Sequence, residues 1–331
     1  MSLFSSIQIT LNNSTVVLAK YALPWTAYMD VVTKYSIEAR TSWLSDERES
    51  TGLTETSKSR SKPFFNNGTG RFRGPIMHGF FRMTKYMVPG IEIRVTMTRN
   101  RPEFMLLYGE DPKAPKTFRL TLDKAYVHVY KKKLYPEIHL AMENQLLKTP
   151  AVYEFCDFVM KPIIVQSNVF SVDYVICEST LLPSRVDIIR KFAFGSVSIQ
   201  RFQLANGSSG AKRSIALTPY QMNFAGGSYL RQHIGFIRGL NSDLGHHGGN
   251  LIVDYKAYGT SSTVLSFKLT QVTDCEDTNM KTQPEQGTLR LKLTYDSSKT
   301  RIITDSIIVM CFLKYDKEFQ IGPNGSVILQ N

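Results

Sequence analysis

Alternation of apolar and polar residues is the strongest local pattern in this chain. Residues 91–98 place Ile, Ile, Val and Met at every second position, with Glu, Arg and two Thr between them. A period of two is typical of a β-strand with one buried face. Residues 7–11 and 287–293 show the same alternation. We therefore expect a mostly β protein.

Turn signals separate further strand candidates in both halves of the chain. Val88-Pro89-Gly90 is expected to form a turn between two strands, and Asn12-Asn13-Ser14 a turn after the first strand. The other strand candidates are residues 104–108, 118–130, 151–164, 185–194, 250–258, 264–269 and 306–315. Several short strands at such spacing are typical of β-sandwiches and barrels.

Two segments show helical spacing instead. Residues 25–37 follow Pro24, and residues 135–147 contain Pro136 near their start and end before Pro150. The second helix makes a natural domain connection. We expect a first domain over residues 1–133, a linker helix over 134–150 and a second domain over 151–331. Within the first domain, the polar residues 45–70 predict a long mobile loop.

The chain is basic, and most of its excess charge lies in the first half. Residues 1–150 contain 22 Lys and Arg against 13 Asp and Glu, whereas residues 151–331 contain 18 against 15. Such a charge fits an anionic partner such as nucleic acid, and it also fits a solvated surface that keeps the protein soluble. Because no nucleic-acid-binding motif accompanies the charge, the solvated surface is the favoured interpretation.

Cations and aromatic residues are interleaved between residues 71 and 101, which is the mixture that single-strand-binding surfaces use. The strict alternation of residues 91–98 favours a core strand there instead. The candidate residues for nucleic-acid contact are Arg71, Arg73, Arg82, Lys85, Lys131, Lys132 and Lys133.

No motif in the chain indicates catalysis. The sequence contains no GxSxG, GxGxxG or GxxxxGK[ST] pattern. His246 and His247 lie near Asp243, but neighbouring residues of an extended chain point in opposite directions, so a glycine-rich loop is favoured over a metal site. We expect no catalytic residue, no metal and no cofactor.

The cysteines and the chain's hydropathy bear on where the protein resides. No CxxC pair is present, and Cys156 and Cys311 lie in apolar strand-like runs where cysteine acts as a small hydrophobe. The opening residues lack the features of a secretory signal, and no apolar run reaches transmembrane length. We expect a reduced, intracellular protein that is neither secreted nor inserted in a membrane.

The order of these segments resembles a known family, the major capsid (hexon) proteins of Maverick/Polinton transposons and adintovirus-like elements. The resemblance extends over nearly the whole chain, although each motif is short. The segments that carry it are Leu3–Asn12, Tyr28–Tyr35, Gly74–Phe81, Val88–Val95, Arg99–Phe104, Phe118–Tyr130, Leu134–Leu147, Pro219–Phe224, Gly287–Leu293 and Ser306–Tyr315. In the family, Gly74–Phe81 and Val88–Val95 would be paired strands around a tight turn.

The resemblance implies a double jelly-roll, in which two antiparallel β-sandwich or barrel domains stand side by side and are joined by a short linker helix. It implies a structural, non-enzymatic subunit that forms homotrimers of pseudo-hexagonal outline in an icosahedral shell. The implied partners are further copies of the chain, penton and minor capsid proteins, and nucleic acid only non-specifically. The implied location is the virion and, in the host cell, the cytoplasm or nucleus.

One departure from the family qualifies this expectation. Family members carry a segment upstream of the matching region that supplies early strands of the first roll, whereas here the match begins at Met1. The first roll is therefore expected to be incomplete, as in a truncated or endogenous copy.

Two other classes of function stay open at the level of sequence. One is a basic β-sandwich module that binds nucleic acid or glycan, and the other is a hydrolase built on a β-scaffold. Self-association separates the first from a shell subunit, because a trimer supports the shell and a monomer with salt-sensitive DNA affinity supports the binding module.

Overall fold

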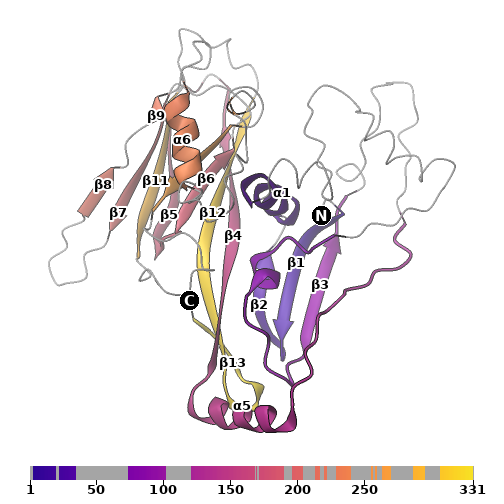
Figure 1. Ribbon diagram of the computed structural model, residues 1–331. Helices are drawn as coiled ribbons and strands as arrows, with labels where there is room; N and C mark the ends of the chain where they lie inside the picture. The colour runs from indigo at the N-terminus through magenta and orange to yellow at the C-terminus, as the bar shows by residue number, and fades with distance from the viewer. Residues whose placement is uncertain are drawn as a thin grey trace. The chain divides into compact units, whose positions relative to one another are not determined.

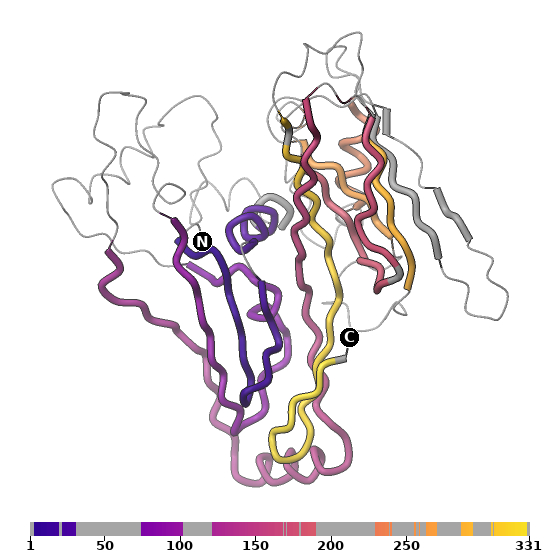
Figure 2. Tube along the Cα trace, turned by 180° about the vertical axis from the view of Figure 1, so that it is seen from behind, coloured from indigo at the N-terminus to yellow at the C-terminus, as the bar shows by residue number. Residues whose placement is uncertain are grey.

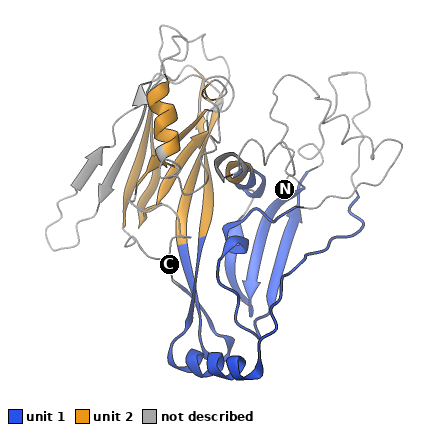
Figure 3. Cartoon of the chain, viewed as in Figure 1, with its two compact units in different colours: residues 1–27, 51–155, 317–331 blue, residues 28–50, 156–316 orange. Residues whose placement is uncertain are grey.

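The structure is a computed structural model of the 331-residue chain. It describes residues 3–19, 22–34, 74–101, 121–167, 169, 171–189, 196–203, 213–216, 220–221, 229–239, 255, 258, 263–269, 286–294 and 306–330. The chain divides into two compact units that are not continuous in sequence (Figure 3). Unit 1 contains residues 1–27, 51–155 and 317–331, and unit 2 contains residues 28–50 and 156–316. The domain limits expected at residues 133 and 150 stay a prediction.

Unit 1 is built on a three-stranded antiparallel sheet in the order β2-β1-β3 (Figure 1). Its strands are β1 (Phe4–Leu11), β2 (Ser14–Ala19) and β3 (Ile93–Arg99). The predicted alternation is confirmed in β1, where Ile7, Ile9 and Leu11 are fully buried. These side chains contribute to a core that also contains Phe155 and Phe319.

The turn between β1 and β2 follows from its two asparagines. Asn12 and Asn13 both have positive φ, 43° and 69°. A two-residue hairpin loop needs positive φ at both positions to match the twist of its strands, and asparagine tolerates that region better than most residues. The turn that the sequence predicted here is confirmed.

Unit 1 also contains α5 (Pro136–Lys148), the short 3-10 helix η2 (Gly79–Arg82) and a second 3-10 turn, η4 (Pro323–Gly325). The helix predicted at 135–147 is confirmed as α5, with proline in its first turn, and its role as a linker between domains stays a prediction. The beginning of β4 (Ala151–Val165), the end of β12 (Ile307–Ile321) and β13 (Val327–Gln330) complete the unit.

Two five-stranded sheets form a sandwich whose strands lie mostly in unit 2. One sheet has the order β10-β6-β12-β13, with β4 paired to β12, and the other has the order β5-β11-β7-β8, with β9 paired to β7. The new strands are β5 (Ser171–Leu181), β6 (Arg185–Ile189), β7 (Ser196–Gln203), β8 (Arg213–Ala216), β9 (Tyr220–Gln221), β10 (Val264–Lys268) and β11 (Gln286–Thr294). β4 and β12 continue from unit 2 into unit 1, and β13 belongs wholly to unit 1 (Figures 1 and 3).

The core of unit 2 lies between the two sheets. Leu289, Leu291 and Leu293 of β11 face Val186 and Ile188 of β6 within one cluster of buried apolar side chains. The strands that the sequence predicted at 151–164, 264–269, 287–293 and 306–315 are confirmed as β4, β10, β11 and β12. The strand predicted at 185–194 is confirmed over its described part, Arg185–Ile189.

Two helices complete the described structure. α1 (Leu23–Lys34) confirms the helix predicted from residue 25 onward, as far as the structure describes it. α6 (Leu230–Gly239), labelled in Figure 1, was not predicted. It packs on β10 in unit 2.

Three strand predictions are wrong. The strand that the resemblance implied at Gly74–Phe81 does not form, because Pro75 lacks an N–H group and the His78 side chain accepts a hydrogen bond from the Phe80 N–H to start η2. Residues 121–130 are exposed and pair with no described strand, so no ladder of hydrogen bonds forms there. In the segment 250–258, Tyr255 and Tyr258 are helical and stack near α6.

Several expectations fall outside the described residues. They are the loop at 45–70, the strand at 104–108, and the glycine-rich segment that contains His246 and His247.

The cysteine expectation needs one correction. Cys156 lies in β4 as expected, but it is disulfide-bonded rather than reduced. Cys177 and Cys311 are free and buried.

Candidate functional site

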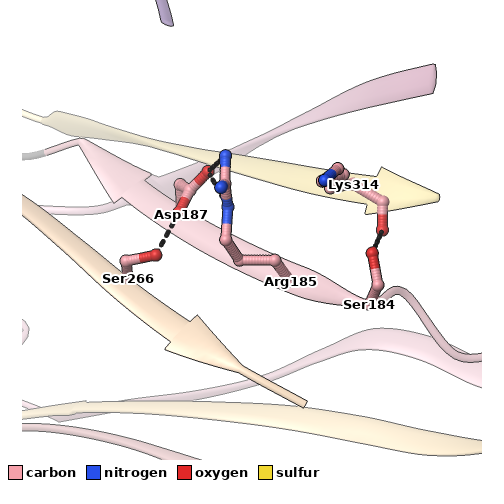
Figure 4. Close-up of polar contacts among 5 residues, drawn as sticks. All are labelled: Ser184, Arg185, Asp187, Ser266 and Lys314. Carbon is pink, nitrogen blue, oxygen red and sulfur yellow. Dashed lines mark hydrogen bonds and ion pairs between the residues drawn. The ribbon is translucent and has the colours of Figure 1, made fainter. Parts of the chain in front are cut away.

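The most strongly buried polar group of unit 2 lies on the outer face of the sheet that contains β6. Arg185, Asp187 and Lys314 are at most 3% exposed, and Ser184 and Ser266 are also buried (Figure 4). Residues 185 and 187 alternate with the core residues Val186 and Ile188, so their side chains point away from the sandwich core.

Strand register brings these groups together. Asp187 lies opposite Ser266 of β10, and Arg185 lies opposite Lys314 of β12. Arg185 Nε donates a 2.9 Å hydrogen bond to Asp187 Oδ2, and its Nη2 lies 2.9 Å from the same oxygen. Ser266 Oγ donates to the other carboxylate oxygen of Asp187 at 2.6 Å. Both oxygens of the buried carboxylate therefore have partners.

The backbone at the start of β6 extends this network to β12 and β10. Ser184 donates two hydrogen bonds to the Lys314 carbonyl oxygen, from its N–H at 2.8 Å and from its Oγ at 3.2 Å. Leu269 N–H donates to the Ser184 carbonyl oxygen at 2.9 Å. We refer to Ser184, Arg185, Asp187, Ser266 and Lys314 as the buried polar cluster. It joins three neighbouring strands of one sheet.

Helix α6 covers this side of the sheet. A Cβ atom added to Gly239 would lie 2.5 Å from Ser266 Oγ, so only glycine allows the end of the helix to come this close. His233 and Phe236 of α6 pack against the buried Tyr258, whose hydroxyl donates to the Val264 carbonyl oxygen at 3.0 Å. The residues of the buried polar cluster are at most 5% exposed, and their hydrogen bonds hold three neighbouring strands of the sheet together.

The buried polar cluster was not predicted from the sequence. Residues 185–194 were predicted to form a strand, with no role for the opposite charges two positions apart. Arg185 and Asp187 at i and i+2 must share one face of a strand, and that spacing is the signal that could have revealed the pair.

The basic residues predicted to contact nucleic acid lie in different places and have different contacts. Arg71 and Arg73 lie outside the described residues. Arg82 ends η2, and its Nη2 donates to the Met77 sulfur at 3.3 Å. Lys85 Nζ donates to the Val152 carbonyl oxygen at 3.1 Å.

The three consecutive lysines, Lys131, Lys132 and Lys133, are exposed. Lys132 Nζ lies 4.3 Å from the centroid of the ring of Tyr86, the residue that follows Lys85 in sequence. The structure therefore brings Lys85 and Lys132 to the same region of unit 1 and gives Arg82 a different neighbour.

Two functional classes can be examined on the described residues. No group of three or more His, Cys, Asp or Glu side chains there could hold a metal ion. None of the described helices is both long enough and apolar enough to span a bilayer.

Comparison with known proteins gives a result at the level of structure only. No family model matches the sequence, and no curated protein matches it. The structure is similar to a chain in the quasi-atomic model of the PBCV-1 virus capsid, with a TM-score of 0.50 and 9% identity over 100% of this chain and 84% of that chain. It is also similar to PBCV-1 VP54 as fitted into a cryo-EM reconstruction of the virophage Sputnik, with a TM-score of 0.49, 10% identity and the same coverage.

The likeness to the PBCV-1 capsid chain with a TM-score of 0.50, together with the antiparallel sheets, shows the fold class. The chain is mostly β and has the double jelly-roll fold that the family resemblance implied.

Proposed function

We propose that this chain is a structural subunit of a virus-type capsid. The observation that carries the proposal is the likeness of fold over the whole described chain to a chain of the PBCV-1 virus capsid. Jelly-rolls suit shells because paired sheets protect most strand edges and leave side-chain surfaces for contacts between copies. The protein would then act by burying surface against other copies of itself, as a component of the virion.

The finer proposal is a homotrimer of pseudo-hexagonal outline from a Maverick/Polinton or adintovirus-like element. The order of the segments that resemble that family supports it, from the first strand through the helix at 134–147 to the strand at 306–315. Three subunits that each contain two similar rolls form a trimer with six similar corners. Trimers of that outline can tile a closed shell. Penton and minor capsid proteins are the proposed further partners, and the host cytoplasm or nucleus is the proposed site of assembly.

The proposed role is non-enzymatic. The strongest concentration of buried charge in the described residues is the buried polar cluster, in which both oxygens of the Asp187 carboxylate have partners. Its geometry supports sheet architecture rather than catalysis.

The proposal is tested by the mass of the purified protein in solution. Sedimentation velocity over a range of protein concentrations should show a species of about 113 kDa, three times the 37.6 kDa chain mass. Negative-stain images of that species should show compact particles of hexagonal outline.

Circular dichroism and urea unfolding of the same sample provide the control, because they show whether the chain is folded. A folded chain that stays monomeric at every concentration and salt tested would contradict the capsid proposal. A folded trimer without hexagonal outline would contradict the pseudo-hexagonal arrangement and leave a different oligomer.

A further inference from the structure

Residues 121–135 are an exposed segment of unusual composition. They belong to no helix or strand, and every one of them is exposed. Figure 2 shows the segment drawn out along unit 1 until it enters α5. In an extended chain, side chains two positions apart share a face, so Lys124, Tyr126, His128, Tyr130 and Lys132 lie on one face. Three aromatic rings are thus flanked by a lysine at each end.

The rings on this face are open to solvent. Tyr126 is 77% exposed and Tyr130 is 89% exposed. Large apolar groups that gather on a surface mark places of interaction, because leaving them in water forgoes the free energy of burial. Isolated exposed tyrosines are ordinary, but two tyrosines and a histidine at a spacing of two residues form a regular array.

The spacing of this array suits stacked bases. Residues two positions apart in an extended chain are separated by about 6.6 Å, twice the rise of 3.3 Å per residue. Stacked bases are separated by about 3.4 Å, so one base fits between two successive rings. Aromatic side chains on which bases stack are a general means of binding single strands, whose bases are free to leave their own stack.

The charge of the segment favours a polyanion. Residues 121–135 contain four lysines, Lys124 and Lys131–Lys133, against the single carboxylate Asp123. A second copy of this chain would bring more positive charge, since the whole chain carries a formal charge of +12. Binding of a phosphate backbone to the same lysines is favoured, because it releases counterions from the nucleic acid.

A contact within unit 1 holds one end of the array in place. Lys132 Nζ lies 4.3 Å from the centroid of the Tyr86 ring, and the neighbouring Lys85 is fixed by its hydrogen bond to the Val152 carbonyl oxygen. The array therefore ends on a surface that already contains cations, rather than on a loose chain.

We propose that the face formed by Lys124, Tyr126, His128, Tyr130 and Lys132 binds single-stranded nucleic acid without sequence preference. The bases stack between the rings, and the lysines contact phosphates. This function goes beyond a shell role and does not depend on it. It gives a binding role to aromatic residues for which the family resemblance implies a strand of the first roll.

The test is fluorescence anisotropy of the full chain with labelled oligo(dT), oligo(U) and a duplex, each of about 20 nucleotides or base pairs, at about 0.15 M salt. We expect one or both single strands to bind more tightly than the duplex. The double variant Tyr126→Ala/Tyr130→Ala should weaken single-strand binding at least about tenfold, because each lost stacking contact costs roughly that factor. The variant Tyr126→Phe/Tyr130→Phe keeps the rings and should bind as the parent does.

The matched control lies on the opposite face of the same segment. Val127→Thr/Val129→Thr keeps β-branched side chains and removes apolar surface that the proposal does not use, so its binding should equal that of the parent. The variant Lys124→Gln/Lys132→Gln should reduce the slope of log affinity against log salt by about 1.4, since each phosphate contact on a single strand contributes roughly 0.7.

Three results would overturn the proposal. The first is a duplex that binds as tightly as the single strands, which is the behaviour of a purely electrostatic surface. The second is unchanged binding by the tyrosine-to-alanine variant. The third is a change of oligomeric state in the variant Val127→Thr/Val129→Thr, together with an equal loss of nucleic-acid binding in this variant and in Tyr126→Ala/Tyr130→Ala. That result would identify the segment as a strand that docks on another polypeptide.

Discussion

Asn12 connects three segments of unit 1 that are far apart in sequence. Its N–H donates to the Glu92 carbonyl oxygen at 3.1 Å, and its Oδ1 accepts from the Glu92 N–H at 2.8 Å. Its Nδ2 donates to the Gly325 carbonyl oxygen at 2.9 Å. One side chain in a hairpin turn thus fixes the entry to β3 and the 3-10 turn η4.

We expect Asn12→Ala to lower the free energy of unfolding by about 2–3 kcal/mol. The variant loses two side-chain hydrogen bonds and places a Cβ-bearing residue without a polar group at positive φ. The neighbouring variant Asn13→Gly is the control, and it should be neutral or slightly stabilising because glycine adopts positive φ freely. Urea unfolding of both proteins measures the difference, and equal stability of the two variants would contradict this role of Asn12.

The ion pair between Arg185 and Asp187 leads to a second prediction at the scale of residues. Asp187→Ala should cost about 3–5 kcal/mol, because it leaves the buried Arg185 charge without its carboxylate. The double variant Arg185→Met/Asp187→Leu removes both charges and should recover most of that loss. A double variant that is less stable than Asp187→Ala in thermal unfolding would contradict this expectation. It would mean that Arg185 is stabilised by a group other than Asp187.

At the scale of elements, the 3-10 helix η2 shows how aromatic packing determines local structure. Phe80 is 4% exposed, and its ring stacks on Phe319 at a centroid distance of 5.9 Å and meets Phe155 edge-on at 6.0 Å. The neighbouring Phe81 is partly exposed and contacts only Phe80 among the described aromatic pairs. The helix therefore presents one ring to the core of unit 1.

Substitution of these neighbours should have unequal effects. Phe80→Ala should lower the free energy of unfolding by about 3–5 kcal/mol, the usual cost of removing a buried phenylalanine. Phe81→Ala, the matched control, should cost about 1 kcal/mol or less. Chemical denaturation compares them, and similar losses in both variants would mean that η2 does not depend on the aromatic core.

Elements with strong local patterns were predictable, and those that depend on distant partners were not. The alternation in residues 7–11 and the proline at the start of α5 are local signals, and both predictions are confirmed. The segment 121–130 has equally good strand propensity, but propensity supplies no partner strand. Tyr255 and Tyr258 read as strand residues, whereas their packing near α6 selects a helical backbone.

The contacts of the basic residues and of the buried polar cluster also depend on partners that are distant in sequence. Lysines and tyrosines can be recognised in the sequence as suited to nucleic acid, but the contact between Lys132 and Tyr86 joins positions 46 apart. The buried polar cluster likewise needs three strands from residues 184–187, 266 and 314. No short-range pattern predicts such contacts.

At the scale of the whole molecule, buried groups that can ionise set a limit on alkaline stability. Burial raises the pKa of the Cys311 thiol from 9.0 to about 12. Burial, together with the nearby Cys177 thiol, also raises the pKa of Tyr315. The unfolded chain therefore releases these protons at a lower pH than the folded chain does.

We expect the free energy of unfolding to be insensitive to Cys311 below pH 9 and to fall between pH 9 and 12. The Cys311 share of that fall is roughly 1 kcal/mol per pH unit. Urea unfolding at a series of alkaline pH values measures the slope, and Cys311→Ala should show a shallower one. If the two slopes coincided, the thiol would not be protected by the fold. In the native parent at pH 8, Cys311 should also resist alkylation until denaturant is added.

The return of the chain to unit 1 has a consequence for biosynthesis. Phe319 and Ile321, at the end of β12, are fully buried in the core of unit 1, which β1 begins more than 300 residues earlier. A ribosome that has just completed residues 1–155 therefore exposes a nascent chain whose core lacks two of its side chains. Unit 1 must wait until residues 317–330 have left the exit tunnel, and unit 2 must likewise wait for the part of β12 that pairs with β6. The first residues of the protein to be made therefore wait for nearly the whole chain before their core is complete.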